Sequence, residues 1–267
     1  MVKSMVDFEN KLRYDVSDLR KLMALLRSPD GCPWDREQTH KSIRRNLIEE
    51  AYEAAEAIDT DNTEHLIEEL GDVLMQVVFH ADIASENGRF DLDDIADATC
   101  KKLLRRHPHV FGDIRAQDGA ESLTFWEDAK SKEKQHKCVA DAMRSIANNL
   151  PALLLAEKIQ KKAAKVGFDW PDCTGAMESL CSEKTELEEA IRSGGNIEEE
   201  LGDLIFSAVN VARFFDVDPE QALRLSSDKF ILRFSALEKM AQKRGQRLED
   251  MTIDEMEELY QLAKLEN

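Results

Sequence analysis

Glycine, proline and aromatic residues are scarce in this chain of 267 residues, which has 11 glycines, 6 prolines and 6% aromatic residues. So few turn-forming residues leave long segments uninterrupted, and the abundance of Leu, Ala, Glu and Lys favours helix over sheet. No convincing alternation of apolar and polar residues indicates a strand. The composition therefore predicts an all-α protein, and 42% hydrophobic residues are enough for a packed core.

Cysteine motifs and long apolar runs are missing as well. The five cysteines are odd in number and include no Cys-x-x-Cys, which favours free thiols in a reducing cytosol over a disulfide framework or a zinc site. No stretch approaches the ~18 apolar residues of a membrane span, and no apolar signal core opens the sequence. We expect a cytoplasmic protein without a membrane partner.

Basic residues are outnumbered, because 36 Lys and Arg face 54 Asp and Glu for a formal charge of −18. A surface this acidic repels phosphate backbones, so a nucleic-acid partner is not expected. A small anionic substrate is still compatible with the charge, provided that metal cations neutralise the local field.

One acidic motif occurs twice in the sequence. The sequence Glu-Glu-Leu-Gly-Asp occupies 68–72 and again 199–203, and an apolar helical tract follows each copy. Landmarks recur around both copies in the same order, including Gly31 and Trp34 before the first and Gly167 and Trp170 before the second. This agreement indicates an internal duplication.

The duplication predicts two tandem helical bundles. We place the first unit at 1–130, a charged linker at 131–148 and the second unit at 149–267. Helical spacing of apolar residues predicts individual helices over 15–27, 92–106 and 252–266, among other segments.

The repeated acids have the spacing of residues that share one helix face. Glu50 and Glu53 are three residues apart, as are Glu69 and Asp72 on the next predicted helix. Because the connection is short, the two helices should run antiparallel and bring the four carboxylates together. The second unit repeats the arrangement with Glu183, Glu186, Glu200 and Asp203.

Four gathered carboxylates must either raise their pKa values or bind cations. Oxygen-only ligands suit Mg²⁺, with Mn²⁺ as a substitute, and Mg²⁺ accepts substrate phosphates as further ligands. One helix away, each unit has two basic residues at i,i+4 spacing that could face such phosphates. These pairs are Lys102 with Arg106 and Lys229 with Arg233.

The glycines and tryptophans near the acids each allow two interpretations of their role. Gly71 and Gly202 lie inside predicted helices, where glycine costs ~1 kcal/mol relative to Ala, which indicates either close helix approach or room for a ligand. Trp34 and Trp170 could stack on a nucleobase or could pack the loop that precedes the acidic helix.

Three alternatives to a catalytic metal site are a solvated helix face, a di-iron bundle and a non-catalytic protein. An isolated Glu-x-x-Glu is usually a solvated helix face, and only the doubled pattern favours metal binding. A di-iron bundle would need Glu-x-x-His on two helices, whereas the second motif here is Glu-x-x-Asp. A non-catalytic helical adaptor or nucleotide sensor is the remaining alternative.

Four segments together resemble the two-domain form of the MazG family over roughly 15–265. They read CPWDREQTH, EEAYEAAEAI, EELGDVLMQVVFHADIASENGRFDLDDI and RRHPHVFGD. The resemblance implies an all-α nucleoside triphosphate pyrophosphohydrolase that depends on Mg²⁺ and releases a nucleoside monophosphate and pyrophosphate. It also implies homodimers in which two chains complete each bundle, and a catalytic second domain.

Carried onto this chain, the resemblance assigns the catalytic and metal-binding acids to Glu183, Glu186, Glu200 and Asp203. Their first-domain equivalents are Glu50, Glu53, Glu69 and Asp72, with Lys102 and Arg106 as phosphate candidates. Substrate contacts would come from Lys229, Arg233, Lys130, Trp170 and Tyr260. We expect a metal-activated water to attack the α-phosphorus. The chain departs from the family pattern at Ser179 and Asn196, where members often carry basic residues.

Overall fold

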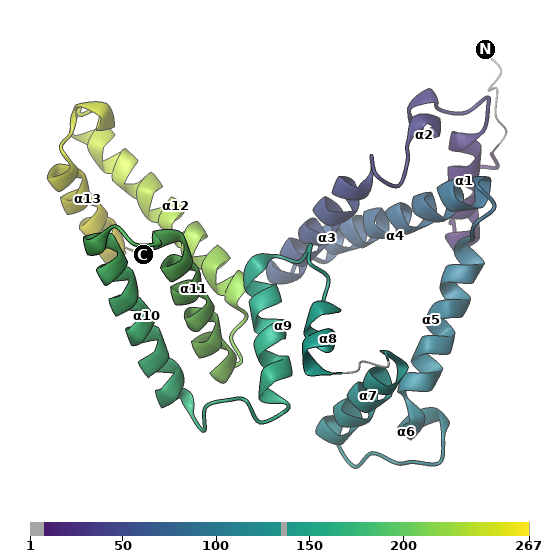
Figure 1. Ribbon diagram of the computed structural model, residues 1–267. Coiled ribbons are helices and arrows are strands. Elements are labelled where there is room, and N and C mark those ends of the chain that lie inside the picture. The colour runs from purple at the N-terminus through teal and green to yellow at the C-terminus, as the bar shows by residue number, and fades with distance from the viewer. Residues whose placement is uncertain (1–7, 135–137, 267) are drawn as a thin grey trace. The chain divides into compact units, whose positions relative to one another are not determined.

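A computed structural model describes residues 8–134 and 138–266. All of its regular elements within these ranges are helices, which confirms the predicted all-α class (Figure 1). The chain divides into two compact units, Met1–Glu133 and Lys134–Asn267, called unit 1 and unit 2 below. None of the described helices is both long and apolar enough to cross a membrane.

Unit 1 is built around a long hairpin of two helices. Its helices are α1 (Val16–Arg27), α2 (Pro33–Glu37), α3 (Arg44–Asp59), α4 (Thr63–Glu86), α5 (Leu92–Arg106), α6 (Pro108–Phe111) and α7 (Gly119–Lys134). The hairpin is α3 with α4, and α1 and α5 both pack against α4.

Unit 2 contains a second hairpin of the same kind. Its helices are α8 (Val139–Arg144), α9 (Ala152–Ala164), α10 (Cys173–Ser193), α11 (Ile197–Phe214), α12 (Pro219–Lys243) and α13 (Ile253–Glu266), with a short 3₁₀ turn at Leu248–Asp250. The hairpin is α10 with α11, α9 packs against α11, and α13 packs against α12.

Local sequence signals fix where several helices begin. Asp15 and Asp91 each form a capping box at the start of α1 and α5, in which the cap side chain and the side chain three residues later bind each other's backbone N–H. The helices predicted over 15–27, 92–106 and 252–266 are confirmed by α1, α5 and α13.

Tight connections make both hairpins antiparallel. Only three residues join α3 to α4, and Asp61 there adopts a positive φ of 51°. Three residues also join α10 to α11, and Gly194 ends α10 in the left-handed conformation with φ of 73°. Glycine is suited to that position because it has no Cβ to clash with the backbone.

The core of unit 1 lies where α1 and α4 meet the residue before α3. Met23, Ile43, Val78, Phe79 and Ile83 form its buried cluster. The Arg27 guanidinium lies over the Phe79 ring at 5.3 Å and donates to the Glu86 carboxylate at 2.6 Å. It also faces Asp82 on α4, with 3.5 Å between Nε and Oδ2. The buried arginine is therefore paired with acids on α4.

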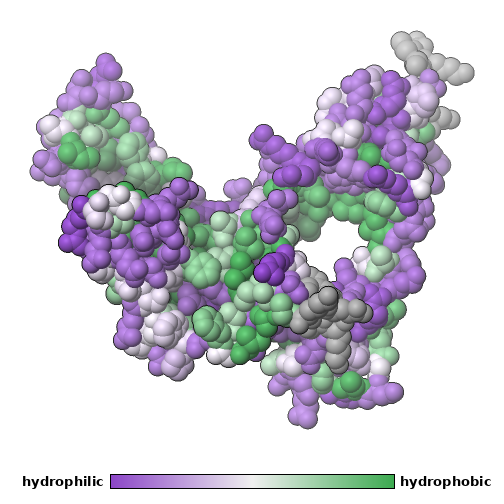
Figure 2. All heavy atoms as spheres, viewed as in Figure 1, coloured by the Kyte–Doolittle hydropathy of each residue, from purple (hydrophilic) through white to green (hydrophobic). Residues whose placement is uncertain are grey.

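Unit 2 has its main buried cluster between α12 and α13 instead. Leu237, Ala241 and Leu259 form this cluster. Large apolar side chains remain exposed in unit 2, and Figure 2 shows hydrophobic residues at the surface next to hydrophilic ones. The most exposed on α11 and α12 include Leu201, Ile205, Leu223, Phe230, Ile231 and Leu232.

The segment that was expected to be a linker contains helical residues. Helix α7 continues to Lys134, and α8 occupies Val139–Arg144. Residues 135–137 between them lie outside the described part of the chain. The predicted linker over 131–148 therefore stays a prediction.

Shortening a core side chain should destabilise unit 1. Ile43 is 2% exposed, so we expect Ile43→Ala to lower the free energy of unfolding by ~2–5 kcal/mol because it leaves a cavity. Urea denaturation measures the change. Ile114→Ala is the matched control, since Ile114 is 48% exposed, and an equal loss in both variants would contradict the packing described here.

Candidate metal and phosphate site

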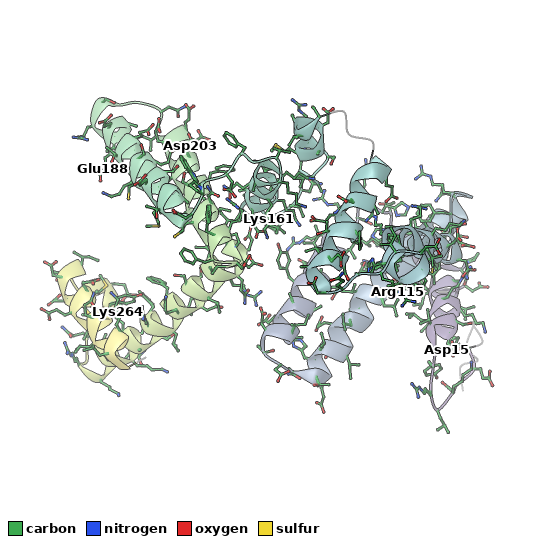
Figure 3. All side chains as sticks on the ribbon, turned by 90° about the horizontal axis from the view of Figure 1, so that it is seen from below. Asp15, Arg115, Lys161, Glu188, Asp203 and Lys264 are labelled. Atoms are coloured by element: carbon green, nitrogen blue, oxygen red, sulfur yellow. The ribbon has the colours of Figure 1, made fainter. Side chains whose placement is uncertain are left out.

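The predicted acids of unit 2 meet across the α10–α11 hairpin. Glu183 and Glu186 lie one turn apart on α10 and Glu200 lies near the start of α11, with one carboxylate oxygen from each within 4.8 Å of the others. Asp203 follows Glu200 by one turn, and its charge acts on both Glu183 and Glu200. Figure 3 labels Asp203 on α11. These four acids form the unit 2 cluster.

Unit 1 repeats the cluster across the α3–α4 hairpin. Carboxylate oxygens of Glu50, Glu69 and Asp72 lie within 4.8 Å of one another, and Glu53 is hydrogen-bonded to Glu50. The contacts of the two clusters differ, because His65 Nε2 lies 2.9 Å from a Glu69 oxygen in unit 1, whereas the Ser182 hydroxyl donates to the Glu186 carboxylate at 3.0 Å in unit 2. These four acids form the unit 1 cluster.

Burial and mutual repulsion change the acidity of both clusters. Burial raises the pKa of the Glu50 carboxyl, and the charges of Asp72, Glu53 and Glu69 raise it further. The pKa of Glu183 is raised by burial and then by Glu186, Asp203 and Glu200. Burial also raises the pKa of Glu200, followed by the charge of Glu186. Each cluster therefore stores repulsion that a cation would relieve.

The glycine between the paired acids leaves open space. A Cβ added to Gly71 or to Gly202 would meet no other atom within 4 Å. Close helix approach, one of the two readings of these glycines, is therefore wrong within each described unit. The open space agrees with the other reading, which was room for a ligand beside the carboxylates.

Ser179 and Asn196, the two residues that depart from the family pattern, each form side-chain contacts within unit 2. Ser179 lies one turn before Glu183, and its hydroxyl is 3.3 Å from that of Ser207 on α11. Asn196 caps α11 by accepting from the Glu199 backbone N–H and also donates to the Glu199 carboxylate. Both residues therefore stabilise the hairpin that carries the acids.

The basic residues expected beside the unit 2 cluster lie on α12. Neither Lys229 nor Arg233 is among the groups that shift the pKa of Glu183 or Glu200. Within the described residues the Arg233 Nε is buried and has no hydrogen-bond partner. The Tyr260 ring on α13 lies 5.7 Å from the ring of Phe230, the residue that follows Lys229 on α12. The structure thus gathers these three residues on α12–α13 and does not bring the bases into contact with the acids.

Two of the three basic residues named for unit 1, Arg106 and Lys130, lie against the Trp126 ring. Arg106 forms an ion pair with Glu133 at 2.7 Å and lies over the Trp126 ring. Lys130 also lies over the Trp126 ring, with 4.6 Å between its Nζ and the ring centroid. Lys102 is half-buried on α5, and none of the three contributes to the shifted pKa of Glu50.

A cavity of about 430 Å³ lies beside the α11 helix in unit 2. Trp170, Phe168 and Phe206 line it with aromatic rings, and Gln160 and Asn210 line it with amides. Phe206 lies on the same face of α11 as Asp203, one turn farther along. Only Trp170 was predicted from the sequence, since polar residues from separate helices carry no local motif.

The equivalent place in unit 1 is filled. In the register of the repeat, Phe79 on α4 corresponds to Asn210 on α11, and its ring is 4% exposed within the core. The Arg27 guanidinium covers this ring. The two units therefore share the acidic cluster but differ in the space beside it.

Comparison with known proteins gives one family for both halves. The model of the MazG nucleotide pyrophosphohydrolase domain matches residues 38–111 and again residues 174–237. Each match contains one acidic cluster and the hairpin that carries it.

Whole-chain relatives agree with the domain match. The chain is 47% identical to the nucleoside triphosphate pyrophosphohydrolase/pyrophosphatase MazG of Thermotoga maritima, over 92% of this chain and 94% of that protein. It is 41% identical to the nucleoside triphosphate pyrophosphohydrolase of Escherichia coli K12, over 93% and 97% respectively. It is also 45% identical to the uncharacterized protein YabN of Bacillus subtilis, over 96% of this chain and 53% of that protein.

The raised pKa of Glu183 predicts a pH-dependent effect of its replacement. A carboxyl whose pKa is raised by folding stabilises the fold below its unfolded pKa, and this contribution is lost as pH rises through the folded pKa. In chelator at about pH 7, Glu183→Gln should therefore melt at a higher temperature than the wild type. The difference should vanish below the usual Glu range of ~4.5.

Scanning calorimetry across this pH range measures the difference. Glu189→Gln is the matched control, because Glu189 lies on the exposed face of α10 outside the cluster. A Glu183→Gln variant that is no more stable than Glu189→Gln at neutral pH would refute the stored repulsion.

Proposed function

The chain belongs to the MazG nucleotide pyrophosphohydrolase family, and on this premise we propose that unit 2 hydrolyses nucleoside triphosphates with Mg²⁺. The products are a nucleoside monophosphate and pyrophosphate. The observation that carries the proposal is the gathering of Glu183, Glu186 and Glu200 oxygens within 4.8 Å. The names of relatives that match over most of the chain support the substrate class.

The donor set of the unit 2 cluster fits a magnesium ion. All its donors are carboxylate oxygens, which Mg²⁺ prefers, and Mn²⁺ accepts the same ligands. The raised pKa of Glu183 and Glu200 reflects repulsion that a divalent cation would offset. The space beside Gly202 leaves room for phosphate oxygens. Glu183, Glu186, Glu200 and Asp203 would hold the metal.

The reaction is an attack of water on the α-phosphorus. A new bond forms between the water oxygen and the α-phosphorus, the bond to the bridging oxygen breaks, and pyrophosphate leaves with that oxygen. Bound Mg²⁺ would supply charge neutralisation for the phosphates and increase the acidity of water. A glutamate of raised pKa, Glu183 or Glu200, is suited to accept the proton that water loses.

Two bases on α12 would offset the remaining negative charge. Lys229 is exposed, and the Arg233 Nε lacks a partner among the described residues, so both can bind a phosphate without first breaking an ion pair with the acids. Lys130 and Tyr260 are further candidates for substrate contacts. Their contribution rests on the family resemblance.

Unit 2 is the better candidate for turnover. Its cluster lies near an aromatic-lined cavity, whereas Phe79 and Arg27 fill the equivalent place in unit 1. The unit 1 cluster has the same donor chemistry and would hold Mg²⁺ on Glu50, Glu53, Glu69 and Asp72. Its His65 contact and its engaged Arg106 distinguish it from unit 2.

A homodimer would cover the exposed apolar side chains of unit 2. Leu201 and Ile205 lie one turn apart on α11, and Ile231 and Leu232 lie on α12, all at least 45% exposed. Exposed apolar faces of this kind mark interaction surfaces in soluble proteins. We propose that a second copy of the chain packs against them and completes the bundle.

Replacing one carboxylate of the unit 2 cluster should abolish turnover. We expect Glu200→Gln to lower the rate of pyrophosphate release from each nucleoside triphosphate by on the order of 100-fold or more, because it removes a metal ligand and a proton acceptor. Circular dichroism would confirm that the helices persist.

Two controls sharpen the assignment. Glu189→Gln on the exposed face of α10 should keep its activity, and Glu69→Gln should retain most of it if unit 2 is the catalytic one. Wild-type turnover by Glu200→Gln with the unit 1 acids also replaced would refute the proposal. Absence of pyrophosphate release by the wild-type protein with any triphosphate and Mg²⁺ would favour a nucleotide sensor or adaptor.

The dimer predicts a mass of two chains in solution. Sedimentation equilibrium should give this mass for the wild type, and Ile231→Asp should shift it towards one chain because a charge would be buried in the interface. Ser226→Asp, an exposed polar position on the same helix, should leave the dimer intact. A monomeric wild type would contradict this part of the proposal.

A further inference from the structure

Two amides in the unit 2 cavity are held in fixed orientations by the protein. Gln160 on α9 donates through Nε2 to the Phe206 carbonyl at 2.8 Å. A carbonyl oxygen can only accept, so the amide nitrogen must face it and the Gln160 Oε1 must point away. This Oε1 is buried and has no hydrogen-bond partner within the described residues. The cavity therefore contains an acceptor in need of a donor.

Asn210 is oriented in the opposite sense. Its Oδ1 accepts from the Arg213 Nε at 3.1 Å and from the Arg213 Nη2 at 2.8 Å. Two donors fix the oxygen towards Arg213, so the Asn210 Nδ2 is turned away as a donor. Arg213 is in turn held by Asp169 on the loop before α10, with 2.9 Å between Nη1 and Oδ2.

The two amides lie next to each other. In α11 the backbone N–H of Asn210 binds the carbonyl of Phe206, four residues earlier, which is the carbonyl that Gln160 also binds. Both residues line the cavity, so its wall contains one acceptor, Gln160 Oε1, and one donor, Asn210 Nδ2. Phe168 and Trp170 add aromatic faces, 82% and 47% exposed, on which a flat ring can stack.

The amides are also at the right distance from the acidic cluster. Asn210 follows Asp203 by seven residues, so both lie on one face of α11 and about 10 Å apart along its axis. The Ser179–Ser207 contact lies between them. A ribose with its α-phosphate bridges a distance of this order.

We propose that Gln160 and Asn210 recognise the hydrogen-bonding edge of the nucleobase, with Arg213 and Asp169 as positioning residues for Asn210. This inference rests on the proposed hydrolysis of nucleoside triphosphates by unit 2. A base satisfies both amides when a donor and an acceptor are neighbours on one edge. Adenine does so with its amino group and N1, and the other common bases also pair a donor with an acceptor.

Analogues of ATP that lack one of these groups test each amide separately. Purine riboside triphosphate lacks the amino donor, and 1-deaza-ATP lacks the N1 acceptor. For the wild type we expect each analogue to raise KM by roughly ten-fold with little change in kcat, since one buried amide atom loses its partner. Equal KM values for ATP and both analogues would overturn the inference.

Matched variants assign the contacts. Gln160→Met should abolish the discrimination against purine riboside triphosphate and keep that against 1-deaza-ATP, and Asn210→Leu should do the reverse. Arg213→Met should act like Asn210→Leu on 1-deaza-ATP while kcat is kept, which a merely structural role would not produce. Discrimination that survives in Gln160→Met or in Asn210→Leu would refute that residue's assignment.

A binding experiment without metal separates this inference from the proposed reaction. In chelator, isothermal titration with AMP and with purine riboside monophosphate should show roughly ten-fold weaker binding of the latter to the wild type, and no difference for Gln160→Met. Equal binding of both nucleotides to the wild type would refute the inference even if hydrolysis is observed. Discrimination between them without any hydrolysis of triphosphates would uphold the cavity and refute the reaction.

Discussion

Repulsion between carboxylates held across a helix hairpin is the constraint on which the site depends. The three-residue connection before α11 fixes the register that sets Glu183 and Glu186 against Glu200. Burial and neighbouring charges then raise the pKa of Glu183, so folding alone leaves the cluster unsatisfied. A divalent cation would relieve this repulsion, and under the proposed function the same cation would bind the phosphates of a substrate. The repulsion between these carboxylates therefore links the hairpin structure to the proposed chemistry of the site.

The duplicated halves show how one scaffold can carry two different sites. Both keep the acidic hairpin, but the neighbouring space is a cavity in unit 2 and a packed core in unit 1. One difference between the two places is Asn210 in unit 2, where the repeat has Phe79 in unit 1. An amide side chain leaves a polar wall, whereas the phenyl ring is buried under Arg27. The acids alone therefore do not determine what a unit can bind.

The sequence predicted what depends on local periodicity and on repetition. Helical spacing placed Glu50 with Glu53 and Glu183 with Glu186, and short connections predicted the antiparallel hairpins that bring the acids together. The sequence could not predict the amide network, because Arg213 and Asp169 are 44 residues apart and meet only through tertiary packing. It also could not choose between the two readings of Gly71 and Gly202, since that choice requires knowing which atoms surround them.

The ion pairs that tie each hairpin to the segment before it have opposite polarity in the two units. Arg27 of α1 meets Asp82 of α4, whereas Asp169 meets Arg213 of α11, and positions 82 and 213 are equivalent in the repeat. If the halves exchanged hairpins during folding, arginine would face arginine and aspartate would face aspartate. Like charges at these two contacts would oppose such an exchange. The reversed pairs would therefore favour the packing of each hairpin against the segment of its own half.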